Sequence, residues 1–101
     1  MMTIITRTVL RVGTEPEWDA AMRDRLDAAS RRDGWIGGQL LIPLERLNER
    51  VIVGTWDTRA DWEAWHADEA FRDTRERMEG LEEDPSETTW HEVVIEQRGP
   101  A

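Results

Sequence analysis

The order in which strand-type and helix-type segments follow one another is the feature that most constrains the fold of this chain. Four segments are rich in β-branched and aliphatic residues and are bounded by turn residues, which is typical of strands. These segments are residues 3–12, 35–43, 50–56 and 88–97. The two long intervals between these segments, after the first strand and after the third, show the apolar periodicity of helices. The predicted order is therefore βαββαβ.

The first helix is expected to begin at Thr14, an N-cap residue with Pro16 in the first turn and Glu17 at the capping-box position. Asp33 and Gly34 are expected to close it. An apolar residue recurs every three or four positions along this otherwise charged helix, which gives one buried stripe. The stripe consists of Trp18, Met22, Leu26 and Ala29.

The second helical interval begins with the same kind of signal, because Thr58 and Asp61 repeat the capping pattern. Trp62 and Trp65 then share one face of the helix. Asp68 is expected to cap a further helical segment that follows them. The second interval is thus predicted to be helical in two pieces.

This order is the ferredoxin-like plan, an α+β fold in which two helices cover one face of a four-stranded antiparallel sheet. We expect one domain over residues 1–101, with a core of about residues 3–97. Val51, Ile52 and Val53 are consecutive, so the third strand is apolar on both of its faces. Helices cover only one face, and the other would expose more apolar surface than a soluble monomer usually tolerates. The sequence therefore predicts a homodimer in which two sheets pack face to face.

The charge balance narrows the choice of partners. The chain has 22 Asp and Glu against 13 Lys and Arg, which gives a net charge of −9. Such a charge repels nucleic acid and anionic membranes, so neither is expected as a partner. Cysteine is absent, which excludes disulfides, thiolate nucleophiles and thiolate metal sites. With no signal-type segment and no apolar run of membrane-spanning length, a soluble cytoplasmic protein is expected.

Aromatic residues gather between Trp56 and His66, where three of the six tryptophans and one of the two histidines occur. Each Trp buries a large ring while its indole N–H still needs a hydrogen-bond partner. Such a run is typical either of a heavy core or of the wall of a pocket for a flat organic molecule. The residues alone leave both interpretations open for Trp56, Trp62 and Trp65.

Several local motifs resemble the antibiotic biosynthesis monooxygenase family, whose members are small proteins that form dimeric α+β barrels. The motifs are the strand opening Gly34-Trp-Ile-Gly-Gly, the junction Thr55-Trp56-Asp-Thr, and the helix Asp61-Trp-Glu-Ala-Trp65 followed by Asp68-Glu-Ala-Phe71. The resemblance covers about residues 3–97. It is more specific for the fold than for the substrate, because one fold hosts several chemistries.

Trp56 and Trp62 stand at positions that line the substrate pocket in family members that oxidise anthrone-type polyketides. The resemblance therefore implies that both residues line such a pocket here. Ile52 stands where those members have an asparagine. An amide that could bind the developing oxyanion of the substrate is therefore missing at this position.

A second branch of the family degrades haem, and the resemblance to it is poorer. Trp65 is retained, but Thr6 stands at an asparagine position and Arg75 at the position of the axial histidine. Without that histidine a haem iron loses its usual protein ligand. The resemblance therefore argues against haem degradation.

The two histidines are candidate general bases, since a neutral imidazole suits that task near neutral pH. His66 directly follows Trp65, so on a helix the two side chains point about 100° apart. If Trp65 points inward, His66 lies at the margin of the core, which counts against it as a base. His91 lies in the fourth strand, on the same face as Val93, and is expected more often as a core residue than as a catalytic one.

Three further polar residues are candidates for substrate binding. Thr6 and Thr8 share a strand face with Ile4 and Leu10, so their hydroxyls are expected to point toward the helices as weak hydrogen-bond donors. Arg75 either pairs with the acidic helix surface or anchors a substrate carboxylate or phenolate.

The leading hypothesis is a cofactor-independent monooxygenase that oxidises a planar aromatic quinol, anthrone or related polyketide with O2. Trp56 and His66 are the catalytic candidates. The substrate-binding candidates are Thr6, Thr8, Ile52, Trp62, Trp65 and Arg75. No cofactor or metal is expected, because the substrate anion can pass an electron to oxygen directly and no convincing metal-ligand pattern occurs. Two alternatives stay open: a non-redox polyketide cyclase or isomerase on the same barrel, and a non-enzymatic small-molecule binding protein.

Overall fold

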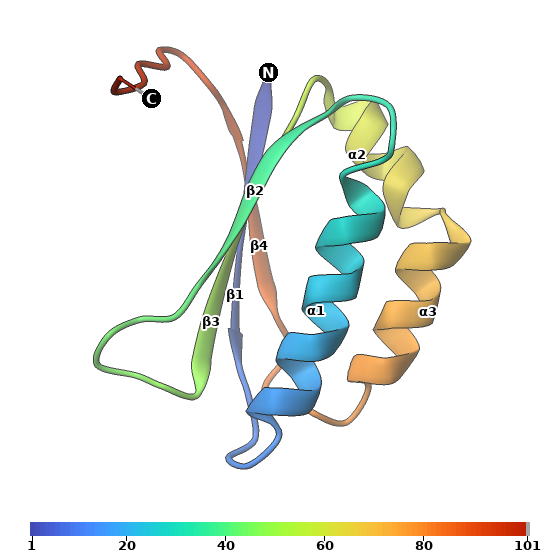
Figure 1. Cartoon of the computed structure of the whole chain (residues 1–101), viewed down its shortest axis with the longest axis vertical. Helices are drawn as coiled ribbons and strands as arrows, with labels where there is room; N and C mark the ends of the chain where they lie inside the picture. The colour runs from blue at the N-terminus through green and yellow to red at the C-terminus, as the bar shows by residue number, and fades with distance from the viewer. Residues whose placement is uncertain (101) are drawn as a thin grey trace.

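A computed structural model describes residues 1–100 and consists of one antiparallel sheet with helices packed against one of its faces (Figure 1). The elements are β1 (Met2–Val9), α1 (Glu15–Ala29), β2 (Trp35–Leu41), β3 (Glu49–Trp56), α2 (Arg59–His66), α3 (Glu69–Met78) and β4 (Glu87–Glu92). The strand order is β2-β3-β1-β4, and every neighbouring pair is antiparallel. The predicted ferredoxin-like α+β fold is therefore confirmed.

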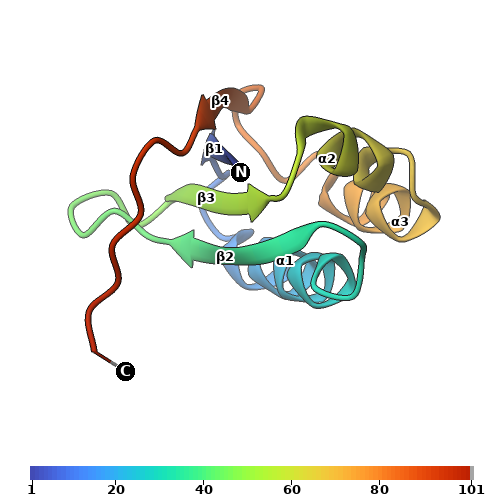
Figure 2. The ribbon, with the colours of Figure 1, turned by 90° about the horizontal axis from the view of Figure 1, so that it is seen from above.

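The helices cover one face of the sheet and leave the other uncovered. Figure 2 shows α1, α2 and α3 on the same side, while the chain after β4 runs on the opposite side. Ile52 of β3 packs against the core under the helices. Because side chains alternate along a strand, Val51 and Val53 face the uncovered side, where both remain partly exposed.

The predicted caps of α2 and α3 are confirmed. Thr58 Oγ1 accepts a hydrogen bond from the Asp61 N–H at 3.1 Å and donates one to Asp61 Oδ2 at 2.8 Å. Asp68 Oδ1 accepts from the Ala70 N–H at 2.9 Å. The same carboxylate binds Arg32 through two hydrogen bonds of 2.9 and 3.0 Å, which ties the start of α3 to the segment after α1. Within residues 1–100, no helix is long and apolar enough to cross a membrane.

Three of the predicted strands end earlier than expected, and β2 is one of them, since it ends at Leu41 instead of residue 43. β1 ends at Val9 instead of residue 12, because the chain turns toward Gly13, whose φ of 96° favours glycine. β4 ends at Glu92 instead of residue 97. Glu92 pairs with Met2, the first residue of β1, and the Val93 N–H still donates to the Met1 carbonyl at 3.0 Å, but the described residues after Val93 continue no ladder. The length of β4 is therefore set by its neighbour and not by its own composition.

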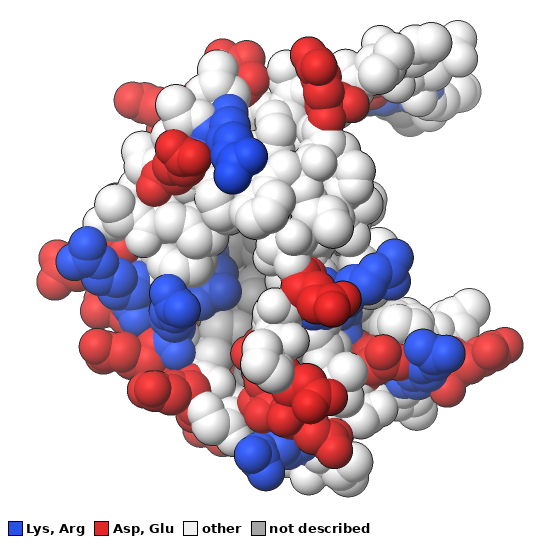
Figure 3. All heavy atoms as spheres, turned by 180° about the vertical axis from the view of Figure 1, so that it is seen from behind, with Lys and Arg blue, Asp and Glu red and all other residues white. Residues whose placement is uncertain are grey.

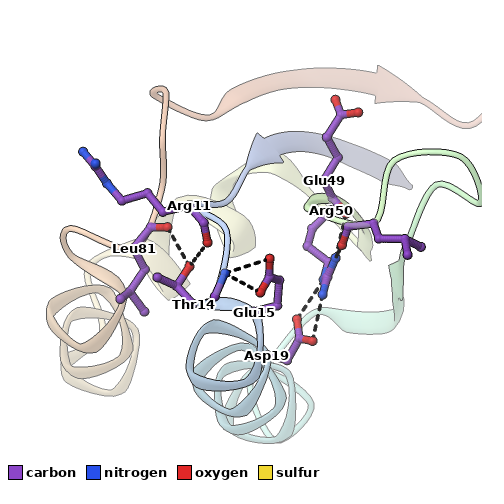
Figure 4. Close-up of polar contacts among 9 residues, drawn as sticks. Arg11, Thr14, Glu15, Asp19, Glu49, Arg50 and Leu81 are labelled. Atoms are coloured by element: carbon purple, nitrogen blue, oxygen red, sulfur yellow. Dashed lines mark hydrogen bonds and ion pairs between the residues drawn. The ribbon is translucent and has the colours of Figure 1, made fainter.

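The predicted capping box at the start of α1 does not form. Thr14 has helical backbone angles (φ −95°, ψ −3°) and makes no side-chain cap. Its hydroxyl lies 2.7 Å from the carbonyl oxygen of Arg11 and 3.0 Å from that of Leu81, and it can donate to either (Figure 4). The carboxylate of Glu15 accepts from the Gly13 N–H at 2.9 Å. Thr14 therefore joins the start of α1 to the segment after α3.

The first helix also stops earlier than predicted, at Ala29, before Asp33 and Gly34. Gly34 adopts a φ of 84°, and a Cβ atom at this position would collide with the carboxyl group of Asp61. Glycine is thus needed here because the start of β2 passes close to the first turn of α2.

A buried ion pair fixes α1 against the sheet. Arg50 of β3 is only 3% exposed, and its guanidinium binds both carboxylate oxygens of Asp19 in α1 at 2.8 and 3.0 Å (Figure 4). Arg50 Nη1 also donates to the carbonyl oxygens of Leu47 and Glu49. A buried cation held by a bidentate partner has a defined geometry, so the pair sets the position of α1 over β3.

We predict that Asp19→Ala lowers the free energy of unfolding by about 3 kcal/mol, because it leaves the Arg50 guanidinium buried without its counter-ion. Urea denaturation measures the change. The matched control is Asp27→Ala in the same helix, which removes an exposed ion pair with Arg31 and should cost less than about 0.5 kcal/mol. Equal losses for the two variants would contradict the role given to Arg50.

Candidate functional site

A cavity of about 1040 Å³ lies between the covered face of the sheet and the helices. It is at the upper end of the range of about 300–1,000 Å³ that is usual for ligand pockets. Figure 3, seen from behind the view of Figure 1, shows a hollow in the surface with both basic and acidic side chains around it. All six tryptophans of the chain line the cavity. They are Trp18, Trp35, Trp56, Trp62, Trp65 and Trp90.

Trp56 forms the end wall of the cavity and is also part of the core. Its ring is 2% exposed. It stacks on Trp65 with ring centroids 6.4 Å apart and meets the edge of Trp35 at 5.2 Å. The alternatives of core and pocket are therefore not exclusive for Trp56 and Trp65, since both are buried and both line the cavity.

A second row of rings runs along the cavity from β4 to α3. Trp90 of β4 meets Trp62 edge-on at 5.4 Å, and Trp62 lies 3.9 Å from the ring of His66. On its other side, His66 lies 4.1 Å from the ring of Phe71. The row places an imidazole between two aromatic surfaces, so a flat ligand that stacks along the wall meets a titratable group.

The hydrogen bonding of His66 defines its tautomer. Nδ1 lies 3.0 Å from the carbonyl oxygen of Trp62, and a carbonyl can only accept. Nδ1 therefore carries the proton, and in the neutral ring Nε2 carries the lone pair. Among the described residues, Nε2 has no hydrogen-bond partner, so its lone pair is not used within the protein, and His66 belongs to the cavity lining.

Burial lowers the pKa of His66 below its usual value of 6.5. The hydrogen bond to Trp62 opposes this change, whereas the positive charges of Arg25 and Arg75 add to it. The imidazole is therefore neutral at physiological pH, which is the form that acts as a base. The sequence had placed His66 at the margin of the core. His66 is instead part of the cavity wall, because α3 follows α2 directly and packs Phe71 against the imidazole.

The remaining predicted residues separate into two groups. Thr6 and Ile52 line the cavity and are direct partners across β1 and β3. Thr6 Oγ1 lies 2.9 Å from the hydroxyl of Thr88, its partner in β4, which also lines the cavity. Thr8 does not reach the cavity lining, because it is buried and donates to Glu82 at 2.8 Å.

The charged residues of the cavity come from α1, α3 and the segment before β4. Arg75 lines the cavity and is exposed, so neither alternative given for it is excluded. His91 is exposed on the uncovered face and lies outside the lining, so its predicted place in an apolar core is wrong. Glu82 is held by the hydroxyls of Thr8 and Ser86, both at 2.8 Å.

Sequence reasoning missed several polar members of the lining, among them Arg25 and Thr88. Arg25 lies about two helical turns after Trp18 and one turn before Ala29, so it interrupts the apolar stripe of α1. This spacing indicates that Arg25 faces the same side of α1 as the apolar residues. The pairing of Thr88 with Thr6 depends on strand register, which the sequence of β4 does not set.

Comparisons with known proteins agree with this architecture. The family model for antibiotic biosynthesis monooxygenase matches residues 1–77. No functionally curated protein matches the sequence. Among solved structures, Rv0793 from Mycobacterium tuberculosis superposes with a TM-score of 0.87 at 15% identity, over 96% of this chain and 98% of that one. SnoaB, a cofactor-independent oxygenase from Streptomyces nogalater, superposes with a TM-score of 0.81 at 18% identity, over 99% and 97% of the two chains. At these identities the structural similarity shows the fold alone.

We predict that His66 titrates below pH 6.5 in the folded protein, because burial and two arginines disfavour its charged form. NMR of the imidazole Cε1–H signals measures the pKa, and the signal missing from His66→Gln identifies the residue. As the pH falls below 6.5, the unfolded chain takes up the proton first, so the stability contributed by neutral His66 is present above pH 6.5 and is lost toward its folded pKa. A folded-state pKa at or above 6.5 would show that the imidazole is solvated.

Proposed function

Because the chain belongs to the antibiotic biosynthesis monooxygenase family, we propose that it is a cofactor-independent monooxygenase of planar, electron-rich aromatic compounds. Quinols and anthrones are the substrate types that we infer. The observation that carries this proposal is the neutral imidazole of His66, which lies between aromatic rings in the wall of a cavity large enough for a fused-ring ligand.

The aromatic wall supports a flat substrate. Indole and phenyl rings offer stacking surfaces, and they exclude water from the ligand that they cover. The rings of Trp62 and Phe71 flank the imidazole at 3.9 and 4.1 Å, so a stacked ligand would lie within reach of the base.

The chemistry follows from a free lone pair on Nε2 of His66. In the proposed reaction, this nitrogen removes a proton from the acidic C–H or O–H of the substrate. The resulting anion passes one electron to O2, and the two radicals combine to a peroxide anion, from which the remaining C–H hydrogen leaves with the outer oxygen as hydroxide. A carbonyl remains, so an anthrone CH2 and one O2 become a quinone C=O and one H2O. The imidazolium returns its proton to the departing hydroxide.

The anion must be stabilised while it exists. Ile52 offers no amide for this purpose, but its cross-strand neighbour Thr6 is paired with Thr88 at 2.9 Å. One of these hydroxyls donates to the other, so the second keeps a proton that it can donate to a substrate oxygen. We propose that this hydroxyl pair serves in place of the missing amide.

We predict that the purified protein consumes one O2 for each anthrone oxidised, in the presence of a chelator. His66→Gln should lower kcat by about 100-fold or more, because the base is lost. Trp62→Ala should mainly raise KM, because a stacking surface is lost. Glu63→Gln is the matched control and should leave both constants unchanged, since Glu63 lies in the same helix as His66 but is exposed outside the cavity. An oxygen electrode with product analysis measures these values.

Two results would contradict the proposed oxidation. Turnover that proceeds equally well without oxygen would favour a cyclase or isomerase on the same cavity. Binding detected by quenching of Trp fluorescence, with the ligand chemically unchanged and no oxygen uptake across a quinol and anthrone panel, would favour a binding protein.

We further propose that the protein is a homodimer joined through the uncovered face of the sheet. This face carries partly exposed apolar residues of two central strands: Ile5, Val9, Val51 and Val53. Leu41 and Ile42 at the end of β2 extend the apolar surface, with 42% and 45% exposure. Apolar surface of this extent is typical of an interaction site. The expected cytoplasmic location also stays a prediction.

We predict that light scattering after gel filtration gives twice the chain mass of 11.8 kDa for the wild type. Val53→Glu places a charge at the centre of the proposed interface and should give the single chain mass. Val12→Glu is the control, because Val12 is 85% exposed in a turn outside the sheet and should leave the mass unchanged. A monomeric wild type at micromolar concentration would contradict the proposed dimer.

A further inference from the structure

Arg25 is a half-buried cation that lines the cavity and takes part in none of the chemistry proposed above. It lies on the face of α1 that also presents Trp18, Met22 and Ala29 to the cavity. Its Nε donates to Thr74 Oγ1 at 2.8 Å, and its Cζ lies 4.3 Å from the centre of the Phe71 ring. These two contacts hold the guanidinium in a defined orientation against α3.

The charge of Arg25 is incompletely compensated. Within residues 1–100, no carboxylate forms an ion pair with it, in contrast to Arg50 and Arg32. Only the Nε hydrogen bond to Thr74 is made, so the two terminal nitrogens have donors to spare. Burial lowers the pKa of Arg25 to about 10, which still leaves it charged at neutral pH. A desolvated cation with free donors favours an anion that enters the cavity.

The nearby acidic residues do not fill this role. Glu82 is the only acid whose field acts appreciably on Arg25, and its carboxylate accepts the hydroxyls of Thr8 and Ser86. Glu83 and Asp84 line the cavity but are exposed, so their charges are screened by salt. Arg75 adds a second positive charge near Arg25. Arg25 and Glu82 are thus half-buried charges of opposite sign in the lining, and Arg25 keeps donors free for an anion because the carboxylate of Glu82 is held by two hydroxyls.

We propose that Arg25 binds a carboxylate of the substrate, so that the substrate class is a planar aromatic monocarboxylic acid. The guanidinium and a carboxylate match as bidentate partners, and such charge-assisted hydrogen bonds are the strong ones. A single carboxylate fits better than a dianion, because the acidic residues of the lining, Glu82, Glu83 and Asp84 among them, repel additional negative charge.

The spacing of the wall supports this orientation. Four side chains follow one another in contact along the wall. Arg25 Cζ lies 4.3 Å from the centre of the Phe71 ring, which lies 4.1 Å from the centre of the His66 ring. The His66 ring in turn lies 3.9 Å from the centre of the Trp62 ring. A ligand held by its carboxylate at Arg25 would extend its rings past Phe71, whose ring is already covered by Arg25 and His66, toward the imidazole and Trp62. The anchor and the proposed base are thus separated by the width of one ring, which suits a fused-ring acid with its reactive carbon away from the carboxylate.

The inference relies on the proposed function only for the aromatic nature of the ligand, and it can be tested without turnover. The probes are 9,10-anthraquinone-2-carboxylate and its neutral carboxamide, neither of which can undergo the proposed oxidation. Quenching of Trp fluorescence gives both dissociation constants. We expect the wild type to bind the carboxylate at least about tenfold more tightly than the carboxamide.

Substitutions of Arg25 test whether this residue causes the preference for the carboxylate over the carboxamide. Arg25→Gln should reduce it to less than about threefold by weakening carboxylate binding alone, and Arg25→Lys should keep an intermediate preference. Arg23→Gln removes the same charge from an exposed position of α1 outside the cavity and should behave as wild type. Circular dichroism checks that each variant is folded.

Equal binding of the two probes by the wild type would overturn the proposal, as would binding of neither, and both readings are independent of how the variants fold. A preference that survives in Arg25→Gln but is lost in Arg75→Gln would also overturn it, since the anchor would then be Arg75. A carboxylate preference without any oxygen uptake on an anthrone carboxylic acid would support the anchor while contradicting the proposed oxidation. The two failures are therefore distinguishable.

Discussion

The cavity depends on the way in which Trp56 is held at the end of the sheet. Trp56 is the last residue of β3 and pairs with both Met2 and Trp35, so its backbone is fixed on two sides. Its buried ring fills the space between Trp35 and Trp65. Thr58 then caps α2 directly after the strand. A large buried ring at this corner is thus fixed between the end of β3 and the start of α2, and both elements contribute residues to the cavity lining.

The arrangement of elements was predictable because it depends on local signals. Periodicity defined the strands and helices, and the caps at Thr58 and Asp68 formed as their side-chain chemistry requires. The boundaries that failed depend on contacts from elsewhere in the chain. Thr14 satisfies carbonyl groups of neighbouring segments instead of capping α1. β4 ends where β1 begins, although its sequence stays apolar beyond that point.

The candidate site was predictable only in part, for a similar reason. The run of aromatic residues between Trp56 and His66 predicts a cluster of aromatic rings. Sequence spacing does not show that the same rings form both the core and the cavity wall. His66 was expected at a margin because only its own helix was considered, and the packing of Phe71 from α3 covers that margin. Arg25 belongs to a different helix from the aromatic run, and only the fold brings it beside Phe71.

The central claim is that a planar aromatic ligand stacks along the wall of the cavity with an oxygen or acidic carbon beside the free nitrogen of His66. A crystal structure of the protein with 9,10-anthraquinone-2-carboxylate tests this most directly. The account predicts the rings against Trp62, with an aromatic C–H edge of the ligand facing the lone pair of His66 Nε2 and both quinone oxygens turned away from it. Ligand bound outside the cavity, or inside it with the imidazole turned away and bonded to protein, would contradict it.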